Sequence, residues 1–155
     1  MARPSATAED YLKAIYCLEQ GGGASTRGVA QRLRVAPPSV TGMLHRLAAQ
    51  ELVRHVRWRG FALTAAGRRL ALRTVRRHRV IETYLARVLA VPDGQVHREA
   101  ERLEHAASDE LVDRMAAALG QPTVDPRRAP IPTREGTVGR ARALYALAEG
   151  AAAAC

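Results

Sequence analysis

Helix start and stop signals restrict the fold of this chain more than any other feature. Three consecutive glycines at 21–23 end a first amphipathic segment, in which Thr7 can cap the helix and Glu9 and Asp10 occupy the first turn. Pro37 and Pro38 suit the first turn of a later helix. The predicted order is a helix over 6–20, a short helix from Ser25 or Thr26 to about 33, a helix over 37–50, and a hairpin around Arg59-Gly60.

The rest of the chain is predicted to be helical up to about residue 120. Thr64 can cap a long helix over about 65–90, which Pro92 and Gly94 separate from the next one. Aromatic residues make up only 4% of the chain, so aliphatic side chains must form the core, which favours helices. The predicted elements are the long helix, a helix over about 95–106, a helix from Ser108 to Gly120, a Pro- and Arg-rich loop over 121–136, and a tail that can form an Ala-rich helix.

Positive charge is concentrated in one half of the chain. Residues 1–79 hold 15 Lys and Arg against 4 Asp and Glu, whereas residues 80–155 hold 9 against 11. A basic half beside a slightly acidic one indicates a surface for a polyanion in the first half only. A preference for arginine over lysine, since Lys13 is the only lysine, contributes to the basic character but does not explain its uneven distribution.

Several classes of protein are excluded by what the chain lacks. It has no run of 18 apolar residues, so no membrane span is expected, and its beginning has no signal-peptide core. Two cysteines, Cys17 and Cys155, are too few for a disulfide framework or a Cys-rich zinc site. A cytoplasmic protein is therefore expected.

The first half has the element order of a winged helix-turn-helix. The helix over 37–50 takes the place of the recognition helix, which inserts into the major groove of DNA. Polar and small residues at its start can contact base edges, while arginines elsewhere can meet phosphates. The expected DNA-binding residues are Arg27, Pro38, Ser39, Thr41, Gly42, His45, Arg46, Arg57 and Arg59. The alternative is that these arginines only solvate a surface.

The second half carries histidines and carboxylates at helical spacing. On a helix over 95–106, His97, Glu101, Glu104 and His105 share one face, and the preceding helix adds His78 and Glu82 at i and i+4. Nitrogen and oxygen donors from several helices can bind a divalent cation, and a set without sulfur suits Mn²⁺ or Fe²⁺. Zn²⁺, Co²⁺ or Ni²⁺ are expected to bind in vitro as well. The alternative is a solvated face with ordinary i, i+4 ion pairs.

The chain resembles the iron- and manganese-dependent repressors (diphtheria-toxin-repressor and manganese-transport-regulator type) over about residues 7–132. The resemblance lies in AEDYLKAIYCLE, RGVAQRL, PPSVTGMLHRL, ALTAAGRRLA, RRHRVIETYL and, most specifically, VHREAERLEH. It implies a DNA-binding first domain and a second domain that binds metal and dimerises. The domains are expected over 1–65 and 66–136, followed by the tail over 137–155, and the fold is expected to be mainly α.

The resemblance also implies two sets of metal ligands. Asp10, Glu101, Glu104 and His105 match the primary, activating site, and His78, Glu82 and His97 match the ancillary site. Iron-type members have Met and Cys at the positions of Asp10 and Glu101, whereas manganese-type members have Asp and Glu there, which favours Mn²⁺.

Three departures from the family pattern stand out. Manganese-type members place a Glu ligand where this chain has Lys13. The family more often has Gly at the position of Arg128. Many iron-type members carry a C-terminal SH3-like domain that completes the ancillary site, and the residues after 133 do not resemble it. The ancillary set is therefore expected to be incomplete.

These observations predict a metal-dependent repressor that binds a palindromic operator in double-stranded DNA as a homodimer and controls genes of metal homeostasis. Dimer contacts are expected from Tyr84, Leu85, Val88, Leu89, Leu111, Val112, Met115 and Leu119. The first alternative is a metal-independent winged-helix regulator. An enzyme is disfavoured because the chain has no nucleophile elbow or phosphate loop. A DNA-packing protein is disfavoured by the acidic second half.

Overall fold

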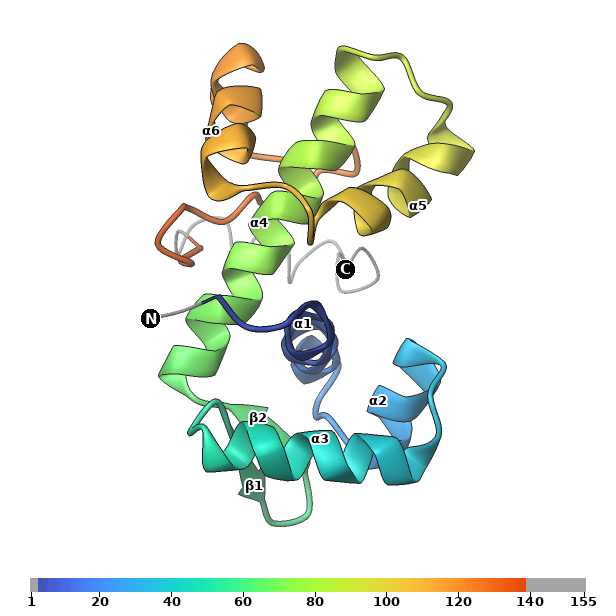
Figure 1. Cartoon of the computed structure of the whole chain (residues 1–155), viewed down its shortest axis with the longest axis vertical. Coiled ribbons are helices and arrows are strands. Elements are labelled where there is room, and N and C mark those ends of the chain that lie inside the picture. The colour runs from blue at the N-terminus through green and yellow to red at the C-terminus, as the bar shows by residue number, and fades with distance from the viewer. Residues whose placement is uncertain (1–2, 139–155) are drawn as a thin grey trace. The chain divides into compact units, whose positions relative to one another are not determined.

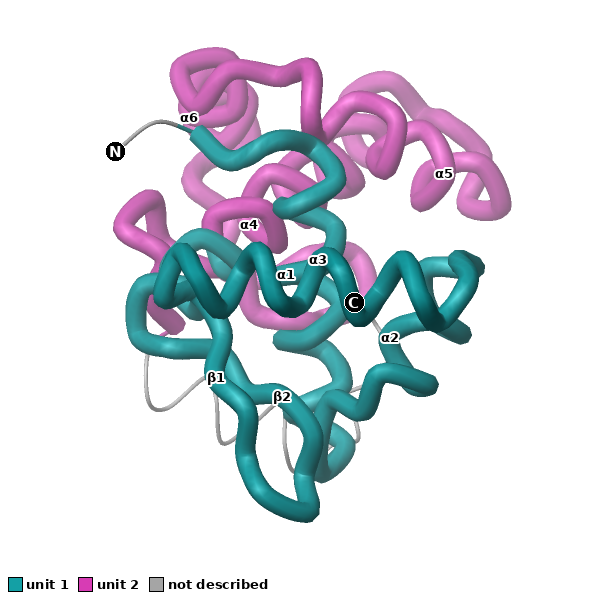
Figure 2. The backbone as a smooth tube through the Cα atoms, turned by 60° about the horizontal axis from the view of Figure 1, so that its bottom comes forward, with its two compact units in different colours: residues 1–72, 155 teal, residues 73–154 magenta. Residues whose placement is uncertain are grey.

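A computed structural model describes residues 3–138 of the chain. These residues form six helices and a two-stranded sheet, so the prediction of a mainly α fold is confirmed (Figure 1). They divide into two compact units, of which the first extends to Leu72 and the second begins at Arg73 (Figure 2). The tail over 139–155, predicted to be helical, lies outside the described residues.

The first unit begins with three helices, and residues at the start of each one favour a helix start there. Ser5 caps α1 by accepting the N–H of Ala8, so the prediction of Thr7 as the cap is wrong. Ser25 caps α2, with its Oγ 3.0 Å from the backbone nitrogen of Gly28. The third helix has no side-chain cap and begins with the two prolines. The bounds are α1 Ala6–Gln20, α2 Thr26–Leu33 and α3 Pro37–Ala49.

The predicted hairpin follows α3. Strand β1 (Val53–Val56) pairs antiparallel with β2 (Gly60–Leu63), and Val56 lies opposite Gly60. Gly60 has a φ of +82°, and a Cβ there would lie 2.4 Å from the carbonyl oxygen of Ala24. Only glycine allows this approach, through which the N–H of Phe61 donates to Ala24. The hairpin is thereby joined to the segment that precedes α2.

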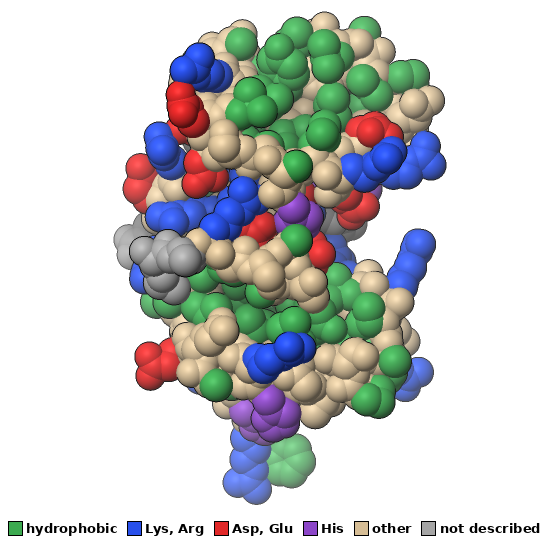
Figure 3. All heavy atoms as spheres, in the orientation of Figure 1, with side chains coloured by type: hydrophobic (Ala, Val, Ile, Leu, Met, Phe, Trp, Pro, Cys, Tyr) green, Lys and Arg blue, Asp and Glu red, His purple; other side chains and the backbone are tan. Residues whose placement is uncertain are grey.

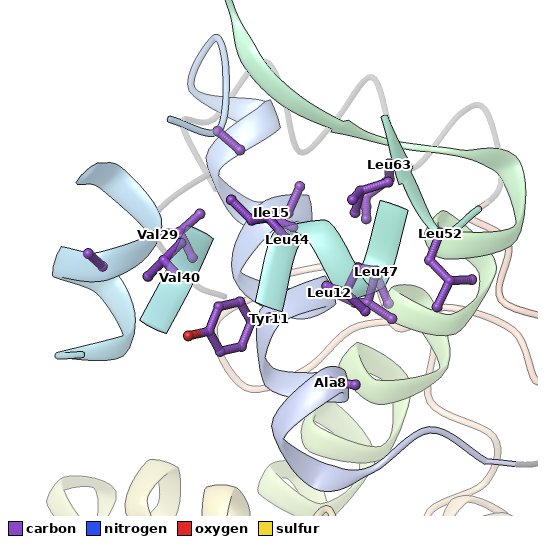
Figure 4. Packing of buried hydrophobic residues seen from close by; sticks show 14 residues of the cluster. Ala8, Tyr11, Leu12, Ile15, Val29, Val40, Leu44, Leu47, Leu52 and Leu63 are labelled. Atoms are coloured by element: carbon purple, nitrogen blue, oxygen red, sulfur yellow. The ribbon is translucent and has the colours of Figure 1, made fainter. Parts of the chain in front are cut away.

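An apolar core joins α1, α2, α3 and the hairpin. Leu12 and Ile15 of α1, Val29 of α2, and Val40 and Leu44 of α3 are all fully buried, and Figure 4 shows them converging. Their spacing along each helix is three or four residues, which is the period of a helical face. The core holds the exposed faces of α3 and the hairpin in fixed positions on this unit.

Two further helices and a loop build the second unit around α4. Helix α4 (Ala65–Arg87) begins in the first unit, and Thr64 Oγ1 accepts the N–H of Gly67 at its start, as predicted. Ser108 caps α6 (Asp109–Ala118) in the same way. Helix α5 (Asp93–Leu103) is shorter than predicted at its end, so Glu104 and His105 lie on the turn that follows it.

The second unit has an apolar core of its own. Buried aliphatic residues of the three helices and of the loop pack together, and they are Val80, Ile81, Leu85, Val96, Ala100, Ala107, Val112, Ala116 and Ile131. Leu85 and Val112, two of the residues expected to contact a second copy, are buried in this core within one chain. Val88, Leu89 and Leu111 are exposed, as a contact surface requires.

Candidate metal centre and DNA-binding surface

His78 is the centre of a buried polar cluster in the second unit. It lies on α4 with 2% of its surface exposed. Its Nδ1 is 2.6 Å from Oε2 of Glu104, and its Nε2 is 3.2 Å from Oε1 of Glu82 and 3.1 Å from Nδ1 of His97. An ionised carboxylate can only accept a hydrogen bond, so with Glu104 ionised the His78 ring donates to it from Nδ1. One imidazole therefore contacts members of both predicted ligand sets.

The predicted ancillary residues lie together. His78 and Glu82 are one turn apart on α4, and His97 comes from α5 with its Nδ1 2.9 Å from Oε1 of Glu82. One donor atom from each of the three lies within 4.8 Å of the others. Two imidazole nitrogens and a carboxylate oxygen are donors that divalent first-row cations accept, so these residues fit such an ion.

The environment of Glu82 keeps its side chain ionised at neutral pH. Burial raises the pKa of Glu82, but hydrogen bonds and positive charge at His78, a hydrogen bond from His97 and the charge of Arg127 outweigh it and lower the pKa to about 2. A carboxylate that is already ionised can bind a cation without first losing a proton.

Glu104 and His105 form the second part of the cluster. Glu104 is 1% exposed, and its Oε1 lies 3.5 Å from Nε2 of His105. The turn that carries them is held from α4, because Nε of the buried Arg77 donates to the carbonyl oxygen of Glu104 at 3.1 Å. Arg77 also contacts Asp109 at the start of α6. These contacts hold both donor side chains inside the unit although they lie beyond the end of α5.

Glu101 and Asp10 are the other two predicted primary ligands. Glu101 is exposed on α5, and its Oε1 lies 3.4 Å from Nε2 of His97, an ancillary residue. Asp10 is half-buried on α1 of the first unit, where Lys13 is one turn away and buried. Within the second unit the structure thus brings together His78, Glu82, His97, Glu104 and His105, with Glu101 at the edge of the cluster beside His97.

Three buried charged residues around the cluster were missed by reasoning from the sequence. Arg77, Arg79 and Asp125 are each no more than 5% exposed. The two arginines lie in a run of basic residues that is typical of a solvated face. Asp125 lies in a Pro-rich segment without helical periodicity, and an Asp followed by Pro in a loop is the one local signal of a turn.

The predicted DNA-binding residues of α2 and α3 all lie on the surface of the first unit. Arg27 is exposed on α2, and the exposed positions on α3 are Pro38, Ser39, Thr41, Gly42, His45 and Arg46. The hydroxyl of Thr41 donates to the carbonyl oxygen of Pro37 at 3.3 Å, within its own helix. A Cβ at Gly42 would meet nothing within 4 Å, so this face is open to another molecule.

The tip of the hairpin adds one residue that sequence reasoning missed. Trp58 lies between Arg57 and Arg59 and is 89% exposed, and the Arg57 guanidinium lies 5.0 Å from the centre of its ring. Figure 3 shows blue side chains and a green one projecting at the lower end, where Figure 1 places the hairpin.

Both units match models of known protein families. Residues 4–61 match the model "Iron dependent repressor, N-terminal DNA binding domain", and residues 64–133 match "Iron dependent repressor, metal binding and dimerisation domain". The regulator MntR of Geobacillus kaustophilus is 35% identical over 126 residues, which are 81% of this chain and 89% of that protein. The repressor IdeR of Mycobacterium tuberculosis is 38% identical over 127 residues, which are 81% of this chain and 55% of IdeR.

Solved structures agree with these matches. A manganese-dependent transcriptional repressor in complex with manganese superposes with a TM-score of 0.77 at 42% identity, over 85% of this chain and 61% of that one. ScaR with bound Zn²⁺ gives a TM-score of 0.77 at 36% identity, over 85% and 62%. The chain belongs to the family of iron-dependent repressors. It spans about half the length of the mycobacterial relatives that it matches.

Two expectations from the sequence can be compared with these results. The matched models and relatives are transcription regulators, so the enzymatic alternative has no support. Among the helices of residues 3–138, none combines the length and the apolar character that a membrane crossing requires.

Proposed function

We propose that this chain is a metal-dependent transcriptional repressor that binds a palindromic operator as a dimer and controls genes of metal homeostasis. The observation that carries the proposal is the buried cluster around His78, in the unit that matches a metal-binding and dimerisation domain. Buried titratable groups are costly to a fold unless they are paired or bind an ion. Three such buried groups, His78, Glu82 and Glu104, converge here with the half-buried His97 and His105. A separate part of the chain matches a DNA-binding domain.

Mn²⁺ or Fe²⁺ is the proposed activating ion, with Mn²⁺ favoured. Glu104 and His105 belong to the primary set, which Asp10 and Glu101 complete by the family pattern. The ancillary set is His78, Glu82 and His97. All donors are oxygen or nitrogen, which suits Mn²⁺, and Zn²⁺, Co²⁺ or Ni²⁺ would compete in vitro. Relatives of this chain have been solved with manganese and with zinc, and one is named as manganese-dependent.

A bound cation supplies positive charge that neutralises the carboxylates. The contribution of His78 follows from its contacts: Nδ1–H keeps the ring oriented against Glu104, and Nε2 has to give up its proton to act as a ligand. Metal affinity is therefore expected to fall at low pH, where this nitrogen keeps its proton.

The cation would regulate DNA binding by selecting one of two conformational states of the chain. If the cation binds the DNA-competent state more tightly, it shifts the chain toward that state, and DNA must tighten metal binding by the same factor. Dimerisation would place two recognition helices on two half-sites of the operator. The exposed Val88, Leu89 and Leu111 of the second unit offer an apolar surface for the second copy.

The test is a titration of duplex DNA, selected from a random pool in the presence of Mn²⁺, with and without a chelator. Mn²⁺ is expected to raise the affinity about 5- to 150-fold, the usual range of allosteric coupling. Glu104→Gln should abolish this gain, while Glu99→Gln, at a half-exposed position of α5 where Glu99 pairs with Arg102, should keep it. Trp58 is the only tryptophan of the chain, so its fluorescence reports contact between the hairpin and DNA.

DNA binding that neither the chelator nor Glu104→Gln changes would instead support the metal-independent winged-helix regulator. Absence of any DNA binding at all would overturn both possibilities. If α3 and the hairpin contact DNA, Arg46→Gln should weaken binding to all DNA sequences. It should also reduce the salt dependence of binding, because phosphate contacts release counterions.

A further inference from the structure

A tight turn over residues 125–129 lies beside the ancillary set. Asp125 Oδ1 accepts the N–H groups of Arg127 at 2.9 Å and Ala129 at 2.8 Å. The backbone closes the same turn, since the N–H of Arg128 donates to the carbonyl of Asp125 and the N–H of Asp125 donates to the carbonyl of Ala129, both at 2.9 Å. The backbone of Arg127 therefore has a defined position that does not depend on its side chain.

The turn is fixed to α4 by a buried arginine. Arg79 donates from Nη1 to the carbonyl oxygen of Pro130, and its Nε lies 3.6 Å from Oδ2 of Asp125. Arg79 is 5% exposed and Asp125 is 2% exposed, so water screens this attraction little. The loop that the sequence predicts as irregular is thus held against the helix that carries His78 and Glu82.

This arrangement brings Arg127 to the ancillary set. Its Nη1 lies 3.9 Å from Oε1 of Glu82, the same oxygen that His78 and His97 contact. The side chain is half exposed, so it can leave without disturbing the core. Arg127 also lines a cavity of about 190 Å³ whose other walls are Glu82, Ala86, Asp93, Val96 and Pro126. The Arg127 guanidinium therefore adjoins both this cavity and the Glu82 carboxylate.

We propose that Arg127 is a built-in competitor of the metal ion at the set of His78, Glu82 and His97. Glu82 is the single carboxylate of this set, and a cation that binds there must share or displace the guanidinium. The positive charge of Arg127 also repels a divalent ion directly. The ancillary set then fills only at higher metal concentration than its donors alone would require. The inference rests on the proposed metal-binding function and concerns one of its two ligand sets.

The size of the effect follows from Coulomb's law. A single charge about 5 Å from a divalent ion, in a site open to water, changes its binding by about 1.5 kcal/mol, which corresponds to about tenfold in affinity. The guanidinium can swing away, so an effect of about 5- to 10-fold is expected. Salt screens exposed charges, and the effect must shrink as ionic strength rises.

The experiment compares Arg127→Gln with Arg128→Gln in the full chain, using MnCl₂ alone as the probe. Isothermal titration and the electron paramagnetic resonance of free Mn²⁺ measure the affinities. Glu82→Gln identifies which class of sites belongs to the ancillary set, and a His105→Ala background removes the other class if the two overlap. Arg128 is exposed on the same turn, and among the described residues Arg127, not Arg128, is the arginine of this turn that pairs with Glu82, so Arg128 is the matched control.

Arg127→Gln should tighten the class that depends on Glu82 about 5- to 10-fold at low salt and less at high salt. Arg128→Gln should leave it unchanged, and Arg127→Lys, which keeps the charge, should stay near the original chain. Equal affinity of Arg127→Gln and Arg128→Gln would overturn the inference. If no variant shows a class that depends on Glu82, the inference also fails. Mn²⁺-dependent DNA binding in the same preparations decides separately whether the proposed function stands.

Discussion

The two units of the molecule bury different kinds of side chain. In the first, the core that joins α1, α2, α3 and the hairpin is apolar, and the buried charged residues are Glu9 and Lys13 of α1. In the second, six titratable or charged side chains are buried beside the apolar cluster: Arg77, His78, Arg79, Glu82, Glu104 and Asp125. The first unit is built like an ordinary small domain, while the second contains a polar interior.

This difference shows what each unit is built to hold. An apolar core positions an external surface, here the exposed faces of α3 and the hairpin. A polar interior is expensive, because replacing buried ion pairs by apolar residues is often neutral or stabilising. The second unit therefore carries its buried charges at a cost in stability, and the cluster around His78 is the feature that explains them. The two units should respond to opposite kinds of substitution.

The largest effect is expected from truncating the apolar core of the first unit. Leu44 is 0% exposed on α3, and Leu44→Ala should lower the free energy of unfolding by about 3 kcal/mol through lost burial and a cavity. Chemical denaturation measures the loss, and hydrogen exchange shows whether it is confined to residues 6–63. Val35→Ala, at a residue that is 37% exposed, is the control and should cost less than about 1 kcal/mol. Equal losses would contradict an apolar core at Leu44.

The second unit should be sensitive to loss of a charge instead. Asp125→Ala removes the acceptor of two N–H groups and leaves the buried Arg79 without its carboxylate, which should cost about 2–3 kcal/mol. Hydrogen exchange should rise over residues 73–87 and 121–131 and stay unchanged in α2 and α3. Glu110→Ala, in an exposed pair with Arg114, should cost no more than about 0.5 kcal/mol. A loss of only about 0.5 kcal/mol for Asp125→Ala would show that the turn does not depend on the charge of Asp125.

The same contrast explains which features the sequence could predict. Helix order, the caps Ser25, Thr64 and Ser108, and the hairpin follow from signals that are local in the chain, and the structure has them. The types of residue in the metal cluster were also predictable, because i, i+4 spacing brings His78 and Glu82 to one face.

The arrangement of the cluster depends on contacts between distant residues, and local patterns do not contain it. Periodicity placed Glu104 and His105 on α5, but the helix ends at Leu103 and Arg77, 27 residues away, holds the following turn through the Glu104 carbonyl. The contact between His78 and Glu104, which links the two predicted ligand sets, is of the same kind. So is the turn at Asp125, whose partner Arg79 lies on α4.

The smallest effect, of opposite sign, is expected at the turn that presents Arg127. Arg128 has a φ of +66°, in the left-handed region that costs a residue with a side chain about 1–2 kcal/mol relative to glycine. Arg128→Gly should therefore stabilise the second unit by a net of about 0.5–1 kcal/mol, after the greater freedom of glycine in the unfolded chain is subtracted. Thermal unfolding of the metal-free chain measures it as a rise of a few degrees.

The neighbouring arginine supplies the control for this prediction. Arg127 does not have a positive φ, so Arg127→Gly relieves no strain. It should destabilise the unit by about 0.5–1 kcal/mol. Opposite signs at two adjacent exposed arginines would show that backbone conformation, and not surface charge, governs the stability of the turn. If both Arg127→Gly and Arg128→Gly lowered the stability, relief of strain at Arg128 would not govern the stability of the turn, and the hydrogen bonds of Asp125 would be what holds it. The charge of Arg127 would then matter for the metal ion alone.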